Sequence, residues 1–139
     1  MNLDLREVPF YYINLDDAVE RRNNTESQLK ELGIKNITRV PAIRHSYGAA
    51  GTPRSMQKAL ELAQNGEPFV LMEDDVAVKR FDPIIEIPDD ADAFYLGISG
   101  WGRMNSHSGP FVQWERVSDD ILRTYNMLSG HAIMYITDH

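Results

Sequence analysis

The sequence has no cysteine, no long apolar run and no excess of basic residues, and each absence excludes a class of protein. Without cysteine, the 139-residue chain can form neither disulfides nor thiolate metal sites. No apolar run reaches the length of a membrane span, and the first residues, MNLDLREVPF, lack the basic and apolar regions of a signal peptide. The formal net charge of −7 argues against nucleic acid as a partner. We therefore expect a cytoplasmic protein with no membrane span and no nucleic-acid partner.

Strand signals dominate the first half of the sequence. Residues 8–15, 36–43 and 69–72 are short runs rich in aromatic, β-branched and other apolar side chains, typical of strands buried on both faces. Polar or helix-forming stretches separate these runs. The resulting β-α-β-α-β order favours an α/β fold with a mostly parallel central sheet flanked by helices, in a single domain over residues 1–139.

The two intervening helices have recognisable ends. Asp17 and Glu20 have the spacing of a capping box, and Gly33 has the position of a helix stop. Thr52 and Pro53 are the cap and first-turn residues expected for the second helix. These signals predict helices beginning near residues 17 and 52.

The second half of the sequence is richer in turn residues. The segment 65–68, NGEP, ends the second predicted helix, and residues 93–98, 111–117 and 130–136 have the composition of further strands. Residues 99–110 are rich in Gly, Ser and Asn, and they predict a mobile loop.

Acidic residues follow two of the predicted strands. Asp16 and Asp17 end the first strand, and Glu73, Asp74 and Asp75 end the third. Ligands of open α/β sheets bind at such strand ends. In extended backbone Glu73 and Asp75 project from one face and Asp74 from the other. Two hard oxygen ligands suit Mg²⁺ or Mn²⁺ with a bound phosphate, while turn formation and helix capping are the alternative roles of these acids.

The order and spacing of several motifs carry a family resemblance. YYINLDDAVERR, ELGI, RVPAI, GTPRS and EPFVLMEDDV occur in succession, and GHAIMYI follows later. This series resembles glycosyltransferase family 25, which includes lipopolysaccharide sugar transferases and collagen hydroxylysine galactosyltransferases. The positions that match the family pattern are Ile13, Asn14, Leu15, Asp16, Glu20, Arg21, Arg22, Val40, Ala42, Ser55, Glu73, Asp74, Asp75, His131 and Ala132.

The resemblance implies a Rossmann-like fold of the GT-A type and transfer of a hexose from a UDP-sugar. The acceptor would be a hydroxyl of a glycan, a lipopolysaccharide or a collagen-like chain. Glu73 and Asp75 would hold Mn²⁺ or Mg²⁺. The nucleotide sugar would contact Asn14, Leu15, Asp16, Arg21, Arg22, Ser55, Glu73, Asp74 and His131.

The resemblance leaves the general base open between Asp74, Asp92 and a residue beyond position 139. The chain stops where the family continues, so we expect the C-terminal part of the GT-A domain to be missing, with Asp138 or His139 as substitutes for a last metal ligand. Arg21 and Arg22 could meet phosphate or form a solvated helix face.

Two other classes of function stay open on the sequence. One is a nucleotide-sugar-binding fragment without catalysis. The other is a receiver-type signalling domain, which has an acid pair after its first strand and an aspartate after its third, but also needs a late lysine that is lacking after the C-terminal strand candidates.

Overall fold

A computed structural model describes residues 1–63, 66–97, 99–128 and 130–136, with the backbone alone for residues 48–50. The chain forms two compact units. Unit 1 comprises Met1–Leu96 and the segment from His131 onward, and unit 2 comprises Gly97–Gly130. Unit 2 is therefore an excursion of the chain out of unit 1 and back into it.

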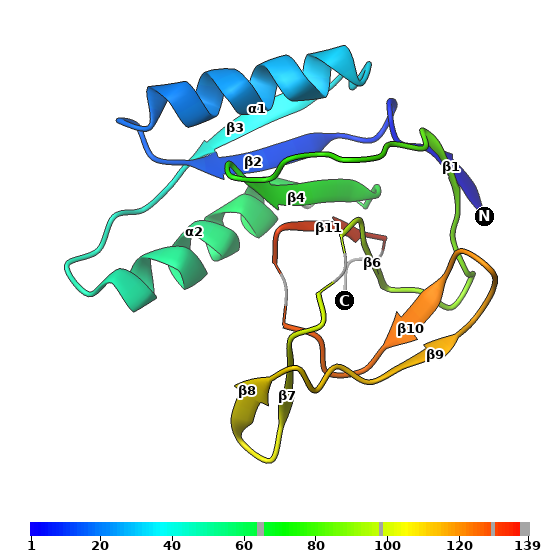
Figure 1. The fold of residues 1–139 in the computed structure, drawn as a ribbon. Helices are drawn as coiled ribbons and strands as arrows, with labels where there is room; N and C mark the ends of the chain where they lie inside the picture. Colours follow the sequence, from blue (N-terminus) through cyan, green and yellow to red (C-terminus); the bar gives the residue numbers. More distant parts are fainter. Residues whose placement is uncertain (64–65, 98, 129, 137–139) are drawn as a thin grey trace. The chain divides into compact units, whose positions relative to one another are not determined.

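A five-stranded mixed sheet is the centre of unit 1 (Figure 1). Its strands are β2 (Phe10–Asn14), β3 (Ile37–Pro41), β4 (Phe69–Glu73), β6 (Ala93–Tyr95) and β11 (Ala132–Tyr135). They lie in the order β3-β2-β4-β11-β6. β2 is parallel to β3 and β4, whereas β11 is antiparallel to both β4 and β6. The last strand along the chain thus lies inside the sheet.

Two helices connect the three parallel strands. α1 (Val19–Glu31) joins β2 to β3, and α2 (Gly48–Ala63) joins β3 to β4. Each helix packs with a different set of side chains of the sheet, because successive residues of a strand face opposite sides. The cluster that contains Leu29 of α1 includes Phe10, Tyr12, Val70, Met72 and Met134, and the cluster that contains Ala59 and Ala63 of α2 includes Val40, Phe69 and Leu71.

One end of α1 matches its prediction and the other does not. Gly33 follows the helix with φ +82°, a left-handed conformation that glycine adopts without strain, so the predicted stop is confirmed. The predicted capping box is wrong, because Ala18 occupies the N-cap position and no side chain caps the helix. The carboxylate of Asp17 instead accepts hydrogen bonds of 2.9 and 3.0 Å from Arg44.

The start of α2 also differs from its prediction. The helix begins at Gly48, one turn before Thr52, so that Pro53 lies inside it. Pro53 is the sixth residue of the helix, beyond the four N–H groups that lack intrahelical partners, so the helix loses one backbone hydrogen bond there. Gly51 permits a close contact with the preceding segment, since a Cβ at this position would lie 2.7 Å from the carbonyl oxygen of Ile43.

Three two-stranded antiparallel sheets complete the described structure. In unit 1, β1 (Asn2–Asp4) pairs with β5 (Ile84–Glu86). In unit 2, β7 (Gly102–Met104) pairs with β8 (His107–Gly109), and β9 (Trp114–Arg116) pairs with β10 (Leu122–Thr124). β1, β5 and β10 were not predicted from the sequence.

The predicted loop over residues 99–110 is wrong, because it contains the β7–β8 hairpin. Asn105 and Ser106 form its two-residue turn with φ values of 48° and 66°. Turns with positive φ match the twist of the flanking strands. Of the neighbouring strand predicted over 93–98, residues 93–95 form β6, and Ile98 lies outside the described residues.

The predicted fold class, a Rossmann-like GT-A fold with a mostly parallel sheet flanked by helices, is wrong. In the described residues the helices number two, and the strands form one mixed sheet and three small antiparallel sheets. Both helices precede β4. The strands that follow β4 are joined without the crossover helices that parallel pairing requires. Among the described residues, no helix has the length and apolar character needed to cross a membrane.

Candidate functional site

Three potential metal ligands meet at the end of β4. Glu73 is the last residue of β4, and His131 precedes the neighbouring strand β11. The backbone N–H of Glu73 donates to the carbonyl oxygen of His131 over 3.0 Å, which fixes the register of the two residues. Their side chains also meet, with His131 Nδ1 3.1 Å from Glu73 Oε2. Asp75 joins them, so that one ligand atom of each residue lies within 4.8 Å of the others.

The chemistry of this Glu73–Asp75–His131 cluster fits a divalent cation. Two carboxylates and one imidazole provide hard oxygen ligands and one nitrogen ligand, a set compatible with Mn²⁺ and, through the oxygens, with Mg²⁺. The side chains of Glu73 and His131 are 37% and 63% exposed, so a metal-bound ligand could approach from solvent. Glu73 and Asp75 were predicted from the sequence to be metal ligands, and the fold brings His131 to them.

Asp74 faces away from this cluster. Asn14 Nδ2 donates to Asp74 Oδ2 over 2.7 Å, and Arg21 Nη1 lies 3.5 Å from Asp74 Oδ1. The side chain is 12% exposed. The structure therefore separates Asp74 from its two neighbours as predicted, although residues 74 and 75 form a turn and not the extended backbone on which that prediction rested.

Asn14 is the centre of a buried polar network below the cluster. It is 1% exposed, and its Nδ2 donates to the carbonyl oxygen of Ala18 over 3.0 Å as well as to Asp74. Its Oδ1 accepts from the Nε atoms of Arg22 and Arg39 over 3.3 and 2.9 Å. Both hydrogens and both lone pairs of the amide are thus used, which satisfies the requirement for burying a polar group.

Arg39 extends the network to Asp16. Its Nη2 donates to Asp16 Oδ1 over 2.6 Å and to the carbonyl oxygen of Asn14 over 3.0 Å. The hydrogen bond from Arg39, followed by the attraction of its charge, holds the pKa of Asp16 below its usual value. Asp16 therefore stays ionised at the end of β2 at neutral pH.

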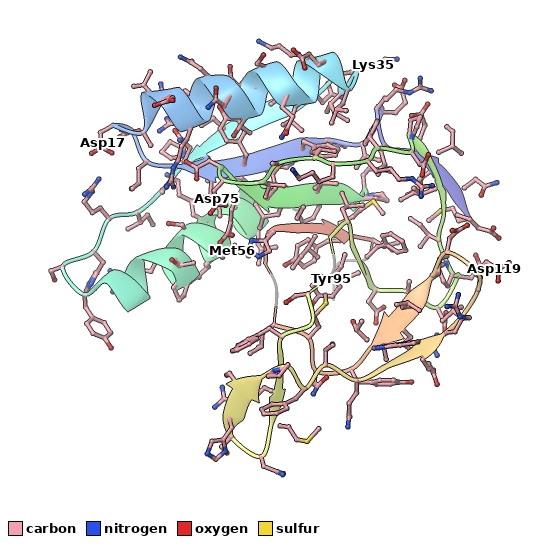
Figure 2. All side chains as sticks on the ribbon, viewed as in Figure 1. Asp17, Lys35, Met56, Asp75, Tyr95 and Asp119 are labelled. Carbon is pink, nitrogen blue, oxygen red and sulfur yellow. The ribbon has the colours of Figure 1, made fainter. Side chains whose placement is uncertain are left out.

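An open pocket of about 330 Å³ lies beside the carboxylates. Figure 2 labels Asp75 and Met56, two of the residues that line it. The segment between β3 and α2, with Arg44 and His45, forms another part of the wall. The lining includes seven of the residues proposed from the sequence, namely Asn14, Leu15, Arg21, Ser55, Glu73, Asp74 and Asp75.

Ser55 lines the pocket but directs its hydroxyl group into the protein. The side chain is 2% exposed, donates to the carbonyl oxygen of Gly51 over 2.8 Å and accepts from the N–H of Ile43 over 2.8 Å. These bonds tie the first turns of α2 to the segment after β3. In this conformation Ser55 shapes the wall of the pocket.

Four of the proposed site residues do not line the pocket, namely Asp16, Arg22, Asp92 and His131. Arg22 donates inward, to Asn14 and to the carbonyl oxygen of Asp16 over 2.8 Å. The carbonyl oxygen of Asp92 accepts from the N–H of Ile136. Ile136 is five residues after His131, and five residues of a strand span about 17 Å. Asp92 is therefore not brought to the Glu73–Asp75–His131 cluster.

Some residues of the site were not predicted from the sequence, and two predicted metal ligands lie outside the described residues. Arg39 carried a usable signal, because a charged residue inside a buried-strand pattern needs a polar partner. Arg44 lies in an irregular segment that gives no such signal. Asp138 and His139, considered as metal ligands, lie outside the described residues.

The assembled site combines a candidate cation-binding cluster with cationic groups on one pocket. The guanidinium groups of Arg21 and Arg44 both line it, and both are more than half exposed, at 62% and 69%. Arginine provides planar donors that match the oxygens of phosphate groups. Comparison with protein-family models, with curated proteins and with solved structures finds no match.

Proposed function

We propose that the chain is a metal-dependent hexosyltransferase, similar to glycosyltransferase family 25, that takes a UDP-sugar as donor. The observation that carries this proposal is the convergence of Glu73, Asp75 and His131 within 4.8 Å at the edge of a pocket that Arg21 also lines. A pocket of about 330 Å³ is at the small end of the range for ligand sites, and it is open to a longer ligand. The motif resemblance supports the choice of donor.

In this proposal each residue of the site has a stated task. Glu73, Asp75 and His131 would hold Mn²⁺ or Mg²⁺. When bound, the ion would neutralise the negative charge on the departing diphosphate. Arg21 lies where its guanidinium can donate to phosphate oxygens. The bond between the hexose anomeric carbon and the diphosphate breaks and UDP leaves, a bond from that carbon to the acceptor oxygen forms, and the acceptor proton passes to the solvent. The proposed acceptor is a hydroxyl of a glycan, a lipopolysaccharide or a collagen-like chain.

Binding of a nucleotide sugar without transfer is the second candidate function. One observation favours it: neither Asp74 nor Asp92, the two bases considered from the sequence, faces the Glu73–Asp75–His131 cluster. A receiver-type domain fits less well, because receivers have a parallel doubly wound sheet and β11 and β6 are antiparallel here.

Titration calorimetry and thermal unfolding test the site. We expect Mn²⁺ to bind, and UDP to raise the unfolding midpoint in the presence of Mn²⁺ by an amount set by its concentration relative to Kd. Asp75→Asn and His131→Ala should abolish both effects. Asp119→Asn and His107→Ala, matched exposed residues of unit 2, should retain them. Absence of any shift with UDP or UDP-sugars would exclude the proposal.

Turnover separates the two candidate functions. Release of UDP from a UDP-hexose in the presence of a glycan acceptor, lost in Asp75→Asn, is the result expected of the transferase. Binding of UDP-hexose with Mn²⁺ but no release of UDP with any acceptor class would support the binding role.

A further inference from the structure

The acidic segment after β4 is fastened to α1 through its backbone. Thr25 Oγ1 donates to the carbonyl oxygen of Asp74 over 3.2 Å. Gln28 then binds twice, donating from Nε2 to the carbonyl oxygen of Val76 over 3.0 Å and accepting at Oε1 from the N–H of Val78 over 2.9 Å. The segment that carries the carboxylates leaves the strand as a turn at residues 74 and 75, and these hydrogen bonds hold it against α1.

Asn14 fixes the one carboxylate of this segment that points toward α1. Its hydrogen bond to Asp74 is the shortest that its side chain makes, at 2.7 Å, whereas Arg21 approaches Asp74 at 3.5 Å. The amide cannot rotate without breaking other bonds, because Arg22 and Arg39 both donate to its oxygen. Being 1% exposed, it also has no access to replacement bonds from water.

The direction of Asp74 determines the direction of its neighbours. Glu73 ends β4, and Asp74 and Asp75 form the turn that follows it, so the three side chains share one short segment whose backbone is bonded to α1. With Asp74 held toward Asn14, Glu73 and Asp75 are turned to the side on which His131 lies. Loss of the bond to Asn14 would release this constraint without removing any group of the cluster.

We propose that Asn14 is a positioning residue for the Glu73–Asp75–His131 cluster, acting through Asp74 and held in place by Arg39 and Arg22. The inference rests on the metal site of the proposed function. In this role Asn14 orients the cluster from the buried side and does not contact the nucleotide sugar. Partners that orient metal ligands typically change metal affinity by about 10- to 100-fold when they are removed.

A donor–acceptor exchange tests this role. Asn14→Asp keeps an oxygen for Arg22 and Arg39 but places acceptors face to face at Asp74 and at the carbonyl oxygen of Ala18. We expect Mn²⁺ affinity, measured by calorimetry, to fall by about tenfold or more. The double variant Asn14→Asp with Asp74→Asn reverses the donor and the acceptor of the bond, and it should recover most of the lost affinity.

Val40→Ala is the matched control for a loss of stability alone. Val40 is fully buried in the adjacent strand β3, so the variant lowers the urea midpoint while the cluster remains intact. It should bind Mn²⁺ like the wild type. Wild-type affinity in Asn14→Asp, or equal losses in Asn14→Asp and Val40→Ala at equal urea midpoints, would overturn the positioning role and leave the proposed function standing.

Backbone amide resonances provide a readout that needs no metal. In Asn14→Asp the amide signals of Glu73, Asp75 and His131 should move, and they should return in the exchanged double variant. Val40→Ala should leave them in place. If the wild type binds no Mn²⁺ but the signals behave in this way, the proposed metal function fails while the positioning by Asn14 holds. Unmoved signals in Asn14→Asp would refute the positioning itself.

Discussion

Unit 1 and unit 2 are organised in opposite ways. Unit 1 has two apolar clusters, one beside each helix, with side chains such as Tyr12 and Val70 that are fully buried. In the described part of unit 2, Gly102 and Gly109 are the buried residues, and Trp114 is 54% exposed. Apolar burial therefore stabilises the first unit, whereas short hairpins and turn hydrogen bonds organise the second.

An asparagine in each unit shows the same difference. Asn14 of unit 1 is buried and bonds to charged side chains. Asn126 of unit 2 bonds to backbone groups, donating to the carbonyl oxygens of Arg103 and Phe111 over 2.9 and 3.0 Å and accepting from the N–H of Gln113 over 2.7 Å. One amide organises a site, and the other joins two hairpins.

The strongest test of the comparison is the removal of a core side chain. Leu71 is 2% exposed in β4, and Leu71→Ala should lower the free energy of unfolding by about 2–5 kcal/mol through lost burial and a residual cavity. Leu128→Ala, in unit 2 and 42% exposed, should change it by less than about 0.5 kcal/mol. Urea unfolding measures both. Equal effects would show that unit 2 contributes to a common core.

A close backbone contact provides the next effect in size. Gly51→Ala places a methyl group 2.7 Å from the carbonyl oxygen of Ile43, and it should cost about 1–3 kcal/mol in urea unfolding. Gly100→Ala in unit 2 is the control, because a Cβ there meets nothing within 4 Å. A neutral result at Gly51 would mean that the start of α2 yields to the added group.

A smaller and local effect is expected at Asn126. Asn126→Ala removes three hydrogen bonds to the backbone, each with a net contribution of about 1 kcal/mol or less at this exposure. Hydrogen exchange should quicken at the amides of β7 to β10 and stay unchanged in β2 and β4. Ser118→Ala serves as the control in the same unit. Faster exchange throughout both units would argue for one cooperative structure.

The smallest effect concerns acid stability in unit 1. Arg6 lowers the pKa of Asp4 from 3.8 to about 2, chiefly through a side-chain hydrogen bond. A carboxyl group whose pKa is lower in the folded state stabilises the fold above its unfolded pKa, and this contribution is lost as the pH falls from about 4 toward 2. In Asp4→Asn the urea midpoint should therefore fall less over this range. Arg6→Gln should have the same effect, and an unchanged acid profile in both variants would contradict the assignment.

The two halves of the sequence differed in how far they predicted the fold. The runs over residues 8–15, 36–43 and 69–72 are confirmed as β2, β3 and β4, whose apolar residues form the sheet around the continuously buried β4. β7 and β8, by contrast, are exposed at four of their six positions, so no burial pattern distinguished them from the predicted loop. The mixed sheet was missed because the pairing of β11 with β4 joins residues far apart in the sequence.

Only the part of the site that lies on β4 and directly after it was predictable from the sequence. Alternation along an extended backbone predicted Glu73 and Asp75 on one side and Asp74 on the other. The structure has this grouping, but through a turn at residues 74 and 75. The arrival of His131 depends on the position of β11 in the sheet, which local patterns do not encode. Arg39 belongs to a partner strand, and its bond to Asn14 likewise follows from tertiary structure.

The place of β11 between β4 and β6 has a kinetic consequence. The sheet cannot be completed until the chain has closed the whole excursion of unit 2, and bringing distant segments together costs conformational entropy before any contact rewards it. Docking of β11 should therefore be a late event in refolding. Since Glu73 meets His131 only in that event, a cation held by both would slow the undocking of β11 and lengthen the lifetime of the folded sheet.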